Sequence, residues 1–273
     1  MAYRLNARYD SAALLSQAGY TKVEENFNPE VGFLRRQNYE KFDAFALYRY
    51  RPTDWLGLYE LRPHIASNAY FDDQGYWESG FTHVDNHWEW HSGIEIHTGV
   101  DFFHEGVKEA FEINPGTFVD PGDYDEVRSN LVFQTDEGKP LSFSTRYQGG
   151  GFFGGNISSL DTEIKARYGN NFSSALSWNH NDVDLPVANG RFKVNVGRLR
   201  LSYSFTPKIL LQALVQYDDR TDLVATNIRF SWLQSASAGL YLVYNEVDDE
   251  NNIGPIKKRR EFAIKYSRII DLL

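Results

Sequence analysis

Histidines and acidic residues gather between positions 83 and 97, and they have the clearest chemical potential in this sequence. In the first group every second residue is a histidine or an acid, so one face of a strand would present them all. A shorter second group follows on the next segment. The first group is His83, Asp85, His87, Glu89 and His91, and the second is Glu95 and His97.

Imidazole and carboxylate groups are ligands of first-row transition metals. Alternate residues on one strand face lie ~6.5–7 Å apart, so neighbours share an ion only with help from an adjacent strand. We therefore interpret the seven residues as lining a polar lumen or contacting a polar ligand. A bound metal is the alternative interpretation, with His83, His87 and His91 as its ligands. The prediction is that the protein holds no metal and no cofactor.

Other catalytic patterns are weak or absent. Glycoside hydrolysis needs two carboxylates held ~5–9.5 Å apart, and nothing in the sequence singles out such a pair. The chain has no Gly-x-Ser-x-Gly, His-Glu-x-x-His or phosphate-loop motif, and no Gly-x-Gly-x-x-Gly run that opens a helical pattern as a dinucleotide site requires. The glycine-rich run at 149–155 opens no helical pattern, and a flexible turn or a close backbone approach would explain it. We predict no catalytic residues, and the sequence favours a protein without enzymatic activity.

Strands must position these residues, because the dominant hydrophobic period is 2. Leu199 and Leu201, for example, alternate with Arg198 and Arg200. Many such segments run for about ten residues, which suits a tilted strand that crosses a bilayer. Soluble strands average nearer ~5–6 residues. Arg198, Arg200 and Arg229 are therefore expected to face a hydrated lumen, although an exposed sheet face of a soluble sandwich would also accept them.

The opposite face of these segments is apolar and has aromatic residues near the strand ends. Tyrosine and tryptophan gather at both membrane interfaces of outer-membrane barrels. We expect this face to contact lipid. The interface aromatics predicted on this basis are Tyr203, Phe205, Tyr217, Trp232, Tyr244 and Tyr266.

Composition narrows the function classes. The 273 residues include 19 Phe, 17 Tyr and 6 Trp but no cysteine, and the mean hydropathy is only −0.50. A spanning barrel has this combination because every second residue faces water. The formal net charge of −9 argues against a nucleic-acid partner, which requires a basic surface. No window approaches the ~18 apolar residues of a transmembrane helix.

The predicted fold is all-β: an antiparallel up-and-down transmembrane β-barrel of about 14–16 strands. No shift in composition divides the chain, so residues 1–273 are predicted to form a single barrel domain. The first residues have no apolar signal-peptide core. Because an outer-membrane protein must be exported, we expect either that a signal peptide was removed or that the chain is a fragment of a longer protein.

Several segments together carry a resemblance to a known family. They are Phe27-Asn28-Pro29-Glu30-Val31-Gly32-Phe33, Pro121-Gly122-Asp123-Tyr124, Gly150-Gly151-Phe152-Phe153-Gly154-Gly155, Leu199-Arg200-Leu201-Ser202-Tyr203-Ser204-Phe205, Gln216-Tyr217, Thr226-Asn227-Ile228-Arg229-Phe230 and Leu242-Val243-Tyr244-Asn245-Glu246. With these segments the chain resembles the C-terminal outer-membrane barrel region of a bacterial family of unknown function. Longer members of that family carry an N-terminal family-9-like carbohydrate-binding module.

The resemblance covers nearly the whole chain and implies an outer-membrane location, but it supplies no catalytic residues. This sequence departs from the family in two ways. It lacks the carbohydrate-binding module and a signal peptide, and Gln234-Ser235-Ala236-Ser237 stands where the family tends to have an Arg-Pro-Gly-Ser-like turn. The missing module and signal peptide are a further reason to expect a fragment. The missing module is also the only part of the family that would have pointed to glycans.

The leading functional hypothesis is a bacterial outer-membrane barrel that acts as a channel, an uptake component or a scaffold. Its expected partners are outer-membrane lipid, carbohydrate or other polar solutes, and periplasmic or surface proteins. A glycan-binding β-sheet module is the first alternative, because exposed Trp and Tyr rings suit sugars. An outer-membrane hydrolase with acids in the barrel mouth is the second.

Overall fold

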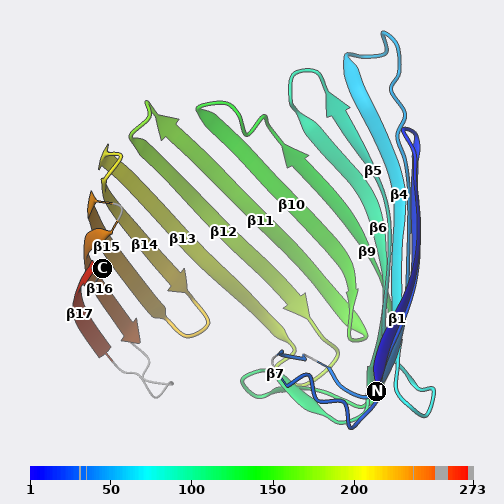
Figure 1. The fold of residues 1–273 in the computed structure, drawn as a ribbon. Coiled ribbons are helices and arrows are strands. Elements are labelled where there is room, and N and C mark those ends of the chain that lie inside the picture. The colour runs from blue at the N-terminus through cyan, green and yellow to red at the C-terminus, as the bar shows by residue number, and fades with distance from the viewer. Residues whose placement is uncertain (31, 35, 236, 250–257, 270–273) are drawn as a thin grey trace. The chain divides into compact units, whose positions relative to one another are not determined.

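The computed structural model describes every residue except 31, 35, 236, 250–257 and 270–273 (Figure 1). The described residues form 17 strands and contain no helix that could cross a membrane. The strands of the first half are β1 (Ala2–Asp10), β2 (Leu14–Val23), β3 (Tyr39–Tyr48), β4 (Leu58–Phe71), β5 (Trp77–Trp90), β6 (Glu95–Val107), β7 (Phe111–Asn114), β8 (Thr117–Val119) and β9 (Gly122–Gln134). Those of the second half are β10 (Leu141–Phe152), β11 (Gly155–Tyr168), β12 (Phe172–Asp184), β13 (Arg191–Thr206), β14 (Ile209–Asp218), β15 (Leu223–Ser235), β16 (Ala238–Asp249) and β17 (Lys258–Arg268).

Fifteen of these strands form one sheet in which each strand pairs with the strand before it in the chain. The single interruption is the β7–β8 hairpin, which pairs only with itself, so that β9 follows β6 in the sheet. The strands pair antiparallel, as in the hairpins β1–β2 and β16–β17. The prediction of an all-β, antiparallel, up-and-down fold is confirmed, and the fifteen sheet strands fall within the predicted number.

Residue contacts divide the chain into two units. Unit 1 comprises Met1–Phe133, Arg146–Ser158 and Val183–Phe192, and unit 2 comprises Gln134–Thr145, Ser159–Asp182 and Lys193–Leu273. Each unit contains sheet strands whose side chains alternate between an apolar and a polar face.

In unit 1 the apolar face is the more exposed of the two. Ile65, Val84 and Val100 lie side by side on β4, β5 and β6, and Val84 is 44% exposed. The next residue along β5, Asp85, points to the opposite face, where its side chain is only 2% exposed. Because successive side chains of a strand point to opposite faces, the exposed valine and the buried aspartate lie on opposite faces of the sheet at this point. The usual pattern of a water-soluble sheet is therefore inverted here.

Unit 2 repeats the alternation. On the apolar face Ala213 and Tyr244 flank Ile228. The same face carries the predicted interface aromatics, and all except Tyr244 are exposed: Tyr203, Phe205, Tyr217, Trp232 and Tyr266. On the polar face Arg229 pairs with Gln212, and Arg198 and Arg200 pair with Gln216 and Leu214. The predicted separation of arginines from aromatics onto opposite faces is thus present.

Few apolar side chains are buried among the described residues. Val119, Val183 and Leu185 form a small cluster in unit 1, against which Phe152, Phe192 and other partly buried side chains pack. The β7–β8 hairpin contributes to it, because Thr117 is fully buried and donates a hydrogen bond to the carbonyl oxygen of Asn189 (2.9 Å). This hairpin was not among the predicted strands. It is too short for a period-2 pattern to stand out.

The glycine-rich run contains both features that would explain it. Gly150 lies within β10 and has a φ of 149°, and a Cβ there would collide with the Val127 carbonyl oxygen. The close backbone approach therefore requires glycine at this position. Phe153 and Gly154, with φ values of 47° and 75°, make the turn between β10 and β11.

The turn between β4 and β5 is organised by one carboxylate. Asp72 accepts hydrogen bonds from the backbone N–H groups of Gln74 and Tyr76 and from Lys108 Nζ (2.8 Å). Lys108 also donates to Glu78 (2.9 Å). The Lys108 ammonium, followed by the Tyr76 amide, holds the pKa of Asp72 below its ordinary value. In return, Asp72 and Glu78 raise the pKa of Lys108.

The Asp72→Asn variant is expected to lose part of the pH dependence of stability in acid. The folded-state pKa of Asp72 lies below the unfolded value of ~3.9, so its contribution is fully present above ~3.9 and is lost as the pH falls through the folded-state pKa. Unfolding free energies of the wild type and the variant should differ at pH 7 and converge in acid. Denaturant titrations between neutral and acid pH measure this. Asp73→Asn, at the exposed neighbouring residue, is the control and should keep the wild-type pH profile.

Candidate polar site on strands β4, β5 and β6

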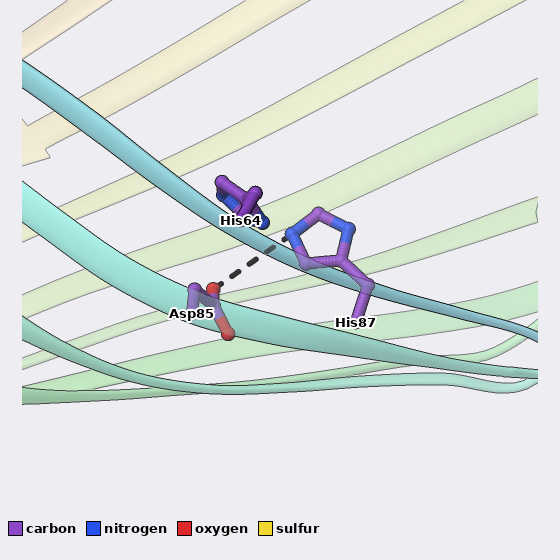
Figure 2. Close-up of side chains that lie close together, drawn as sticks. All are labelled: His64, Asp85 and His87. Carbon is purple, nitrogen blue, oxygen red and sulfur yellow. Dashed lines mark ion pairs between the residues drawn. The ribbon is translucent and has the colours of Figure 1, made fainter. Parts of the chain in front are cut away.

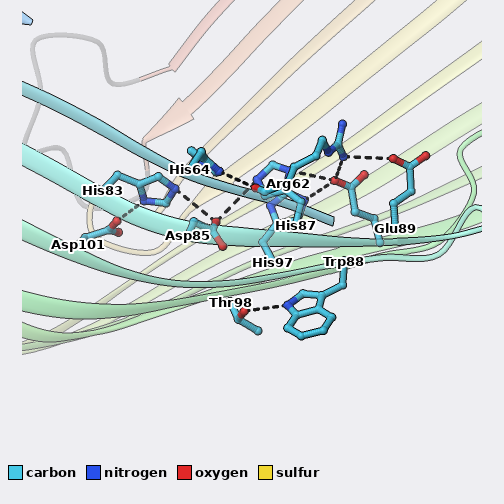
Figure 3. A network of polar contacts seen from close by, with 11 residues as sticks. Arg62, His64, His83, Asp85, His87, Trp88, Glu89, His97, Thr98 and Asp101 are labelled. Carbon is cyan, nitrogen blue, oxygen red and sulfur yellow. Dashed lines mark hydrogen bonds and ion pairs between the residues drawn. The ribbon is translucent and has the colours of Figure 1, made fainter. Parts of the chain in front are cut away.

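The histidine–acid cluster is assembled on the polar face of three neighbouring strands (Figure 3). Strand pairing places its side chains in four rows that run across β4, β5 and β6. The rows are Glu60–Glu89–Glu95, Arg62–His87–His97, His64–Asp85–Gly99 and Ala66–His83–Asp101. Trp88 and Thr98 point to the opposite face of the same strands, where they are joined by a 3.0 Å hydrogen bond.

Arg62 is the cationic centre of the first two rows. Its guanidinium is hydrogen-bonded to Glu95 and lies 3.4 Å from Glu89 Oε2 and 3.9 Å from Glu60 Oε1. Glu60 is buried and also accepts a 2.7 Å hydrogen bond from Arg51 Nε. The Arg62 guanidinium, together with Arg51, thus reduces the repulsion within a row of three carboxylates.

His83 lies between two buried aspartates. Its Nδ1 donates a 2.5 Å hydrogen bond to Asp101 Oδ1, and its Nε2 lies 3.3 Å from Asp85 Oδ2. The second oxygen of Asp101 accepts a 2.6 Å hydrogen bond from Gln148 Nε2 on β10. Both oxygens of Asp101 are thus hydrogen-bonded, which holds its carboxylate in place. The fixed carboxylate in turn orients the His83 ring through Nδ1.

His87 belongs to the second row and contacts acids of the rows on both sides of it. Its Nδ1 faces Glu95 Oε1 at 3.0 Å and its Nε2 faces Asp85 Oδ2 at 3.7 Å. The ring stacks on His97, with centroids 3.5 Å apart and an interplanar angle of 5°. His97 Nε2 in turn donates to Glu95 Oε1 (2.9 Å). This stack links the two predicted groups of histidines and acids into one network.

Several residues of the network were not among the predicted site residues: Arg62, His64, Gly99, Asp101 and Gln148. His64 Nδ1 is hydrogen-bonded to the Arg62 carbonyl oxygen (3.1 Å), and the His64 ring lies 4.9 Å from the His87 ring and 5.1 Å from the His83 ring. Gly99 on β6 pairs with Asp85 on β5, and a Cβ at position 99 would lie 3.0 Å from Asp85 Cγ. Strand alternation places His64 on the same face as Arg62, but only the pairing register brings β4 against β5.

His91 departs from the prediction. β5 ends at Trp90, so His91 lies in the following turn and is exposed, rather than sharing the strand face of His83 and His87. Its ring packs edge-on against Tyr59 at 5.4 Å. The expectation that His91 shares the strand face of His83 and His87 is therefore wrong. The Trp90 backbone makes the turn instead, because its N–H donates to Ile94 and its carbonyl accepts from Gly93.

The three predicted arginines belong to unit 2, whereas the histidine–acid network belongs to unit 1. Arg198, Arg200 and Arg229 belong to the polar face of unit 2 and are exposed. None of them makes an ion pair with an acid in the part of the chain that the structure describes. They add positive charge to a polar sheet face and do not join the histidine–acid site.

The chemistry of the site is that of a charged, hydrogen-bonded network. Two groups in it place three potential metal ligands within 4.8 Å of one another: His64, Asp85 and His87, and His87, Glu95 and His97. The carboxylates are each held by a cation or an imidazole, which does not resemble the acid–base pair of a hydrolase. Neither a protein-family model nor a curated protein matches the sequence of this chain.

Proposed function

We propose that this chain is a bacterial outer-membrane β-barrel whose apolar sheet face contacts lipid and whose polar face lines a hydrated lumen. The observation that carries the proposal is the inverted burial of the two faces. Val84 is 44% exposed, whereas Asp85, the next residue on the strand, is 2% exposed at its side chain. The exposed apolar face matches the lipid-facing outside of an outer-membrane barrel, and the charged side chains on the opposite face match its polar interior.

A soluble β-sandwich would require the opposite arrangement. Its apolar faces pack against each other and its polar faces meet solvent. Here the apolar face of unit 1 exposes Ile65, Val84 and Phe102, while Asp85 and Asp101 are buried on the other face. The main-sheet strands have 9 to 16 residues, enough for the ~9–11 residues of a tilted membrane crossing. Both properties favour lipid as the partner of the apolar face.

The lumen that we propose would suit polar solutes. The polar face of unit 1 carries Arg62 and the histidines of β4–β6, and the polar face of unit 2, taken by itself, carries Arg198, Arg200 and Arg229. Groups of both signs can hydrogen-bond to a polar or carbohydrate solute. We propose a channel or uptake component, with a scaffold for periplasmic or surface proteins as the related role. Membership of the barrel family suggested by the sequence is part of this proposal.

The test is the behaviour of the purified chain in detergent. A barrel should need detergent to stay monodisperse and should migrate differently on SDS gels before and after boiling, because a closed antiparallel sheet resists unfolding by SDS. Reconstituted vesicles should then swell in solutions of small sugars if the lumen conducts them. A chain that is monodisperse without detergent and shows no change in mobility on boiling would contradict the membrane assignment. In that case glycan binding to exposed aromatic rings becomes the function to measure.

A further inference from the structure

We propose that His64, Asp85 and His87 bind a first-row divalent metal ion, for which Zn²⁺ is the fitting probe. This inference goes beyond the outer-membrane function and does not depend on it. The three side chains come from β4 and β5 and approach one another on the polar face (Figure 2). Their potential ligand atoms lie within 4.8 Å of one another. Shifts of about 1 Å would bring them to the ~2.0–2.2 Å of zinc–nitrogen and zinc–oxygen bonds.

The histidines are oriented for metal binding by their second nitrogens. His64 Nδ1 is bonded to the Arg62 carbonyl oxygen. A carbonyl can only accept, so Nδ1 carries the hydrogen and Nε2 presents a lone pair. His87 Nδ1 faces the Glu95 carboxylate at 3.0 Å, which leaves its Nε2 on the side of Asp85. Metal-binding histidines typically have this second partner, because it fixes the tautomer and the ring orientation.

Asp85 supplies the independent observation that points to a cation. Its side chain is 98% buried, since only 2% is exposed, and its Oδ1 has no hydrogen-bond partner. Its Oδ2 faces the Nε2 atoms of His83 and His87 at 3.3 and 3.7 Å. A buried carboxylate oxygen without a partner is costly. A divalent ion between Oδ2 and the imidazole lone pairs would stabilise the buried carboxylate charge, and it would give Oδ1 a partner if both carboxylate oxygens bind it.

The second possible ligand group is less suited to a metal. In the group of His87, Glu95 and His97, the Glu95 carboxylate already bonds Arg62 and His97. The His87 and His97 rings also lie flat against each other, 3.5 Å apart, so a shared ion in the ring planes would need one ring to turn. We therefore assign Glu95 the positioning role on His87 and place the ion on the Asp85 side. Water would complete the coordination.

The experiment measures metal binding to the full chain, refolded in detergent and stripped with a chelator. Co²⁺ is titrated as an optical probe, because its visible absorption reports a low-coordinate site with nitrogen and oxygen ligands, and Zn²⁺ is then used to displace it. We expect one equivalent bound by the wild type. The Asp85→Asn and His64→Gln variants should bind at least tenfold more weakly. Glu95→Gln should weaken binding by ~10–100-fold, the usual effect of losing a second partner.

The matched control is His91→Gln, on a histidine that lies outside the cluster, and it should bind like the wild type. Far-UV circular dichroism and a cooperative unfolding transition check that each variant is folded, whether or not the chain forms a barrel, and only folded variants are compared. Wild-type protein without stoichiometric binding, or unchanged affinity in both Asp85→Asn and His64→Gln, overturns the metal site. If the wild-type chain keeps its heat-dependent shift but binds no metal, the metal site alone is rejected. If the wild-type chain binds metal but needs no detergent to stay monodisperse, the membrane assignment alone is rejected.

Discussion

Replacement of Ile228 by arginine is expected to destabilise the folded chain in lipid by ~2–4 kcal/mol. Ile228 lies on the apolar face of β15, flanked on neighbouring strands by Ala213 and Tyr244. It is 38% exposed, so the expected cost does not come from a filled core. If this face meets hydrocarbon, the guanidinium loses its hydration at the depth where that loss is greatest. Reversible unfolding in urea from lipid vesicles measures the change in free energy.

The matched control is Ser231→Arg on the same strand. Ser231 points to the polar face, between Leu210 and Tyr241 on the flanking strands. A guanidinium there would enter water beside Arg229, and the free energy of unfolding should change by no more than ~0.5 kcal/mol. Equal losses in the two variants would contradict the assignment of the apolar face to lipid. Equal tolerance of both would contradict it too, because an arginine facing hydrocarbon cannot be neutral.

Replacement of Arg62 by methionine is expected to cost about 3 kcal/mol of unfolding free energy, the lower end of the range for breaking a buried ion pair. Arg62 faces Glu60, Glu89 and Glu95, and Glu60 is 5% exposed. Methionine keeps much of the side-chain length but leaves the three carboxylates to repel one another. The expected loss lies at the lower end of this range because 27% of the Arg62 side chain is exposed, so the ion pairs are only partly buried.

Two further variants separate the charge effect from packing. Arg62→Lys keeps a positive charge without the planar fork and should recover part of the loss. Glu95→Gln combined with Arg62→Met should be less destabilised than the sum of the two single variants, because the pair interacts directly. Arg198→Met, on the exposed polar face of unit 2, should change stability by no more than ~0.5 kcal/mol. Strict additivity of Arg62→Met and Glu95→Gln would argue that Arg62 acts by packing alone.

Strand positions were largely predictable because alternation is a local property of the chain. The alternation of His83, Asp85, His87 and Glu89 predicted one strand, and these residues lie on β5 at Trp77–Trp90. The division of Leu199 and Arg200 between opposite faces also follows from period 2 alone. By contrast, the β7–β8 hairpin was missed, because strands of four and three residues are too short to establish a period.

The candidate site was predictable only in part. The residue types of β5 and β6 were visible in the sequence, and so was their need for help from an adjacent strand. Which strand helps, and with which residue, depends on register: His64 faces Asp85 because β4 pairs with β5 at that offset. A shift of one residue would turn His64 to the opposite face. Gln148 reaches Asp101 from still farther along the chain.

By itself, the sequence determined the all-β class, the alternation of apolar and polar residues, and the chemical types available to a site. These are local properties, because backbone geometry makes successive side chains of any strand alternate. Only the tertiary structure decided which face is covered and which is exposed. It also decided that His64 joins Asp85 and His87 while His91 lies in a turn. Those outcomes depend on strand register and on the point where a strand ends, which contacts between distant segments determine.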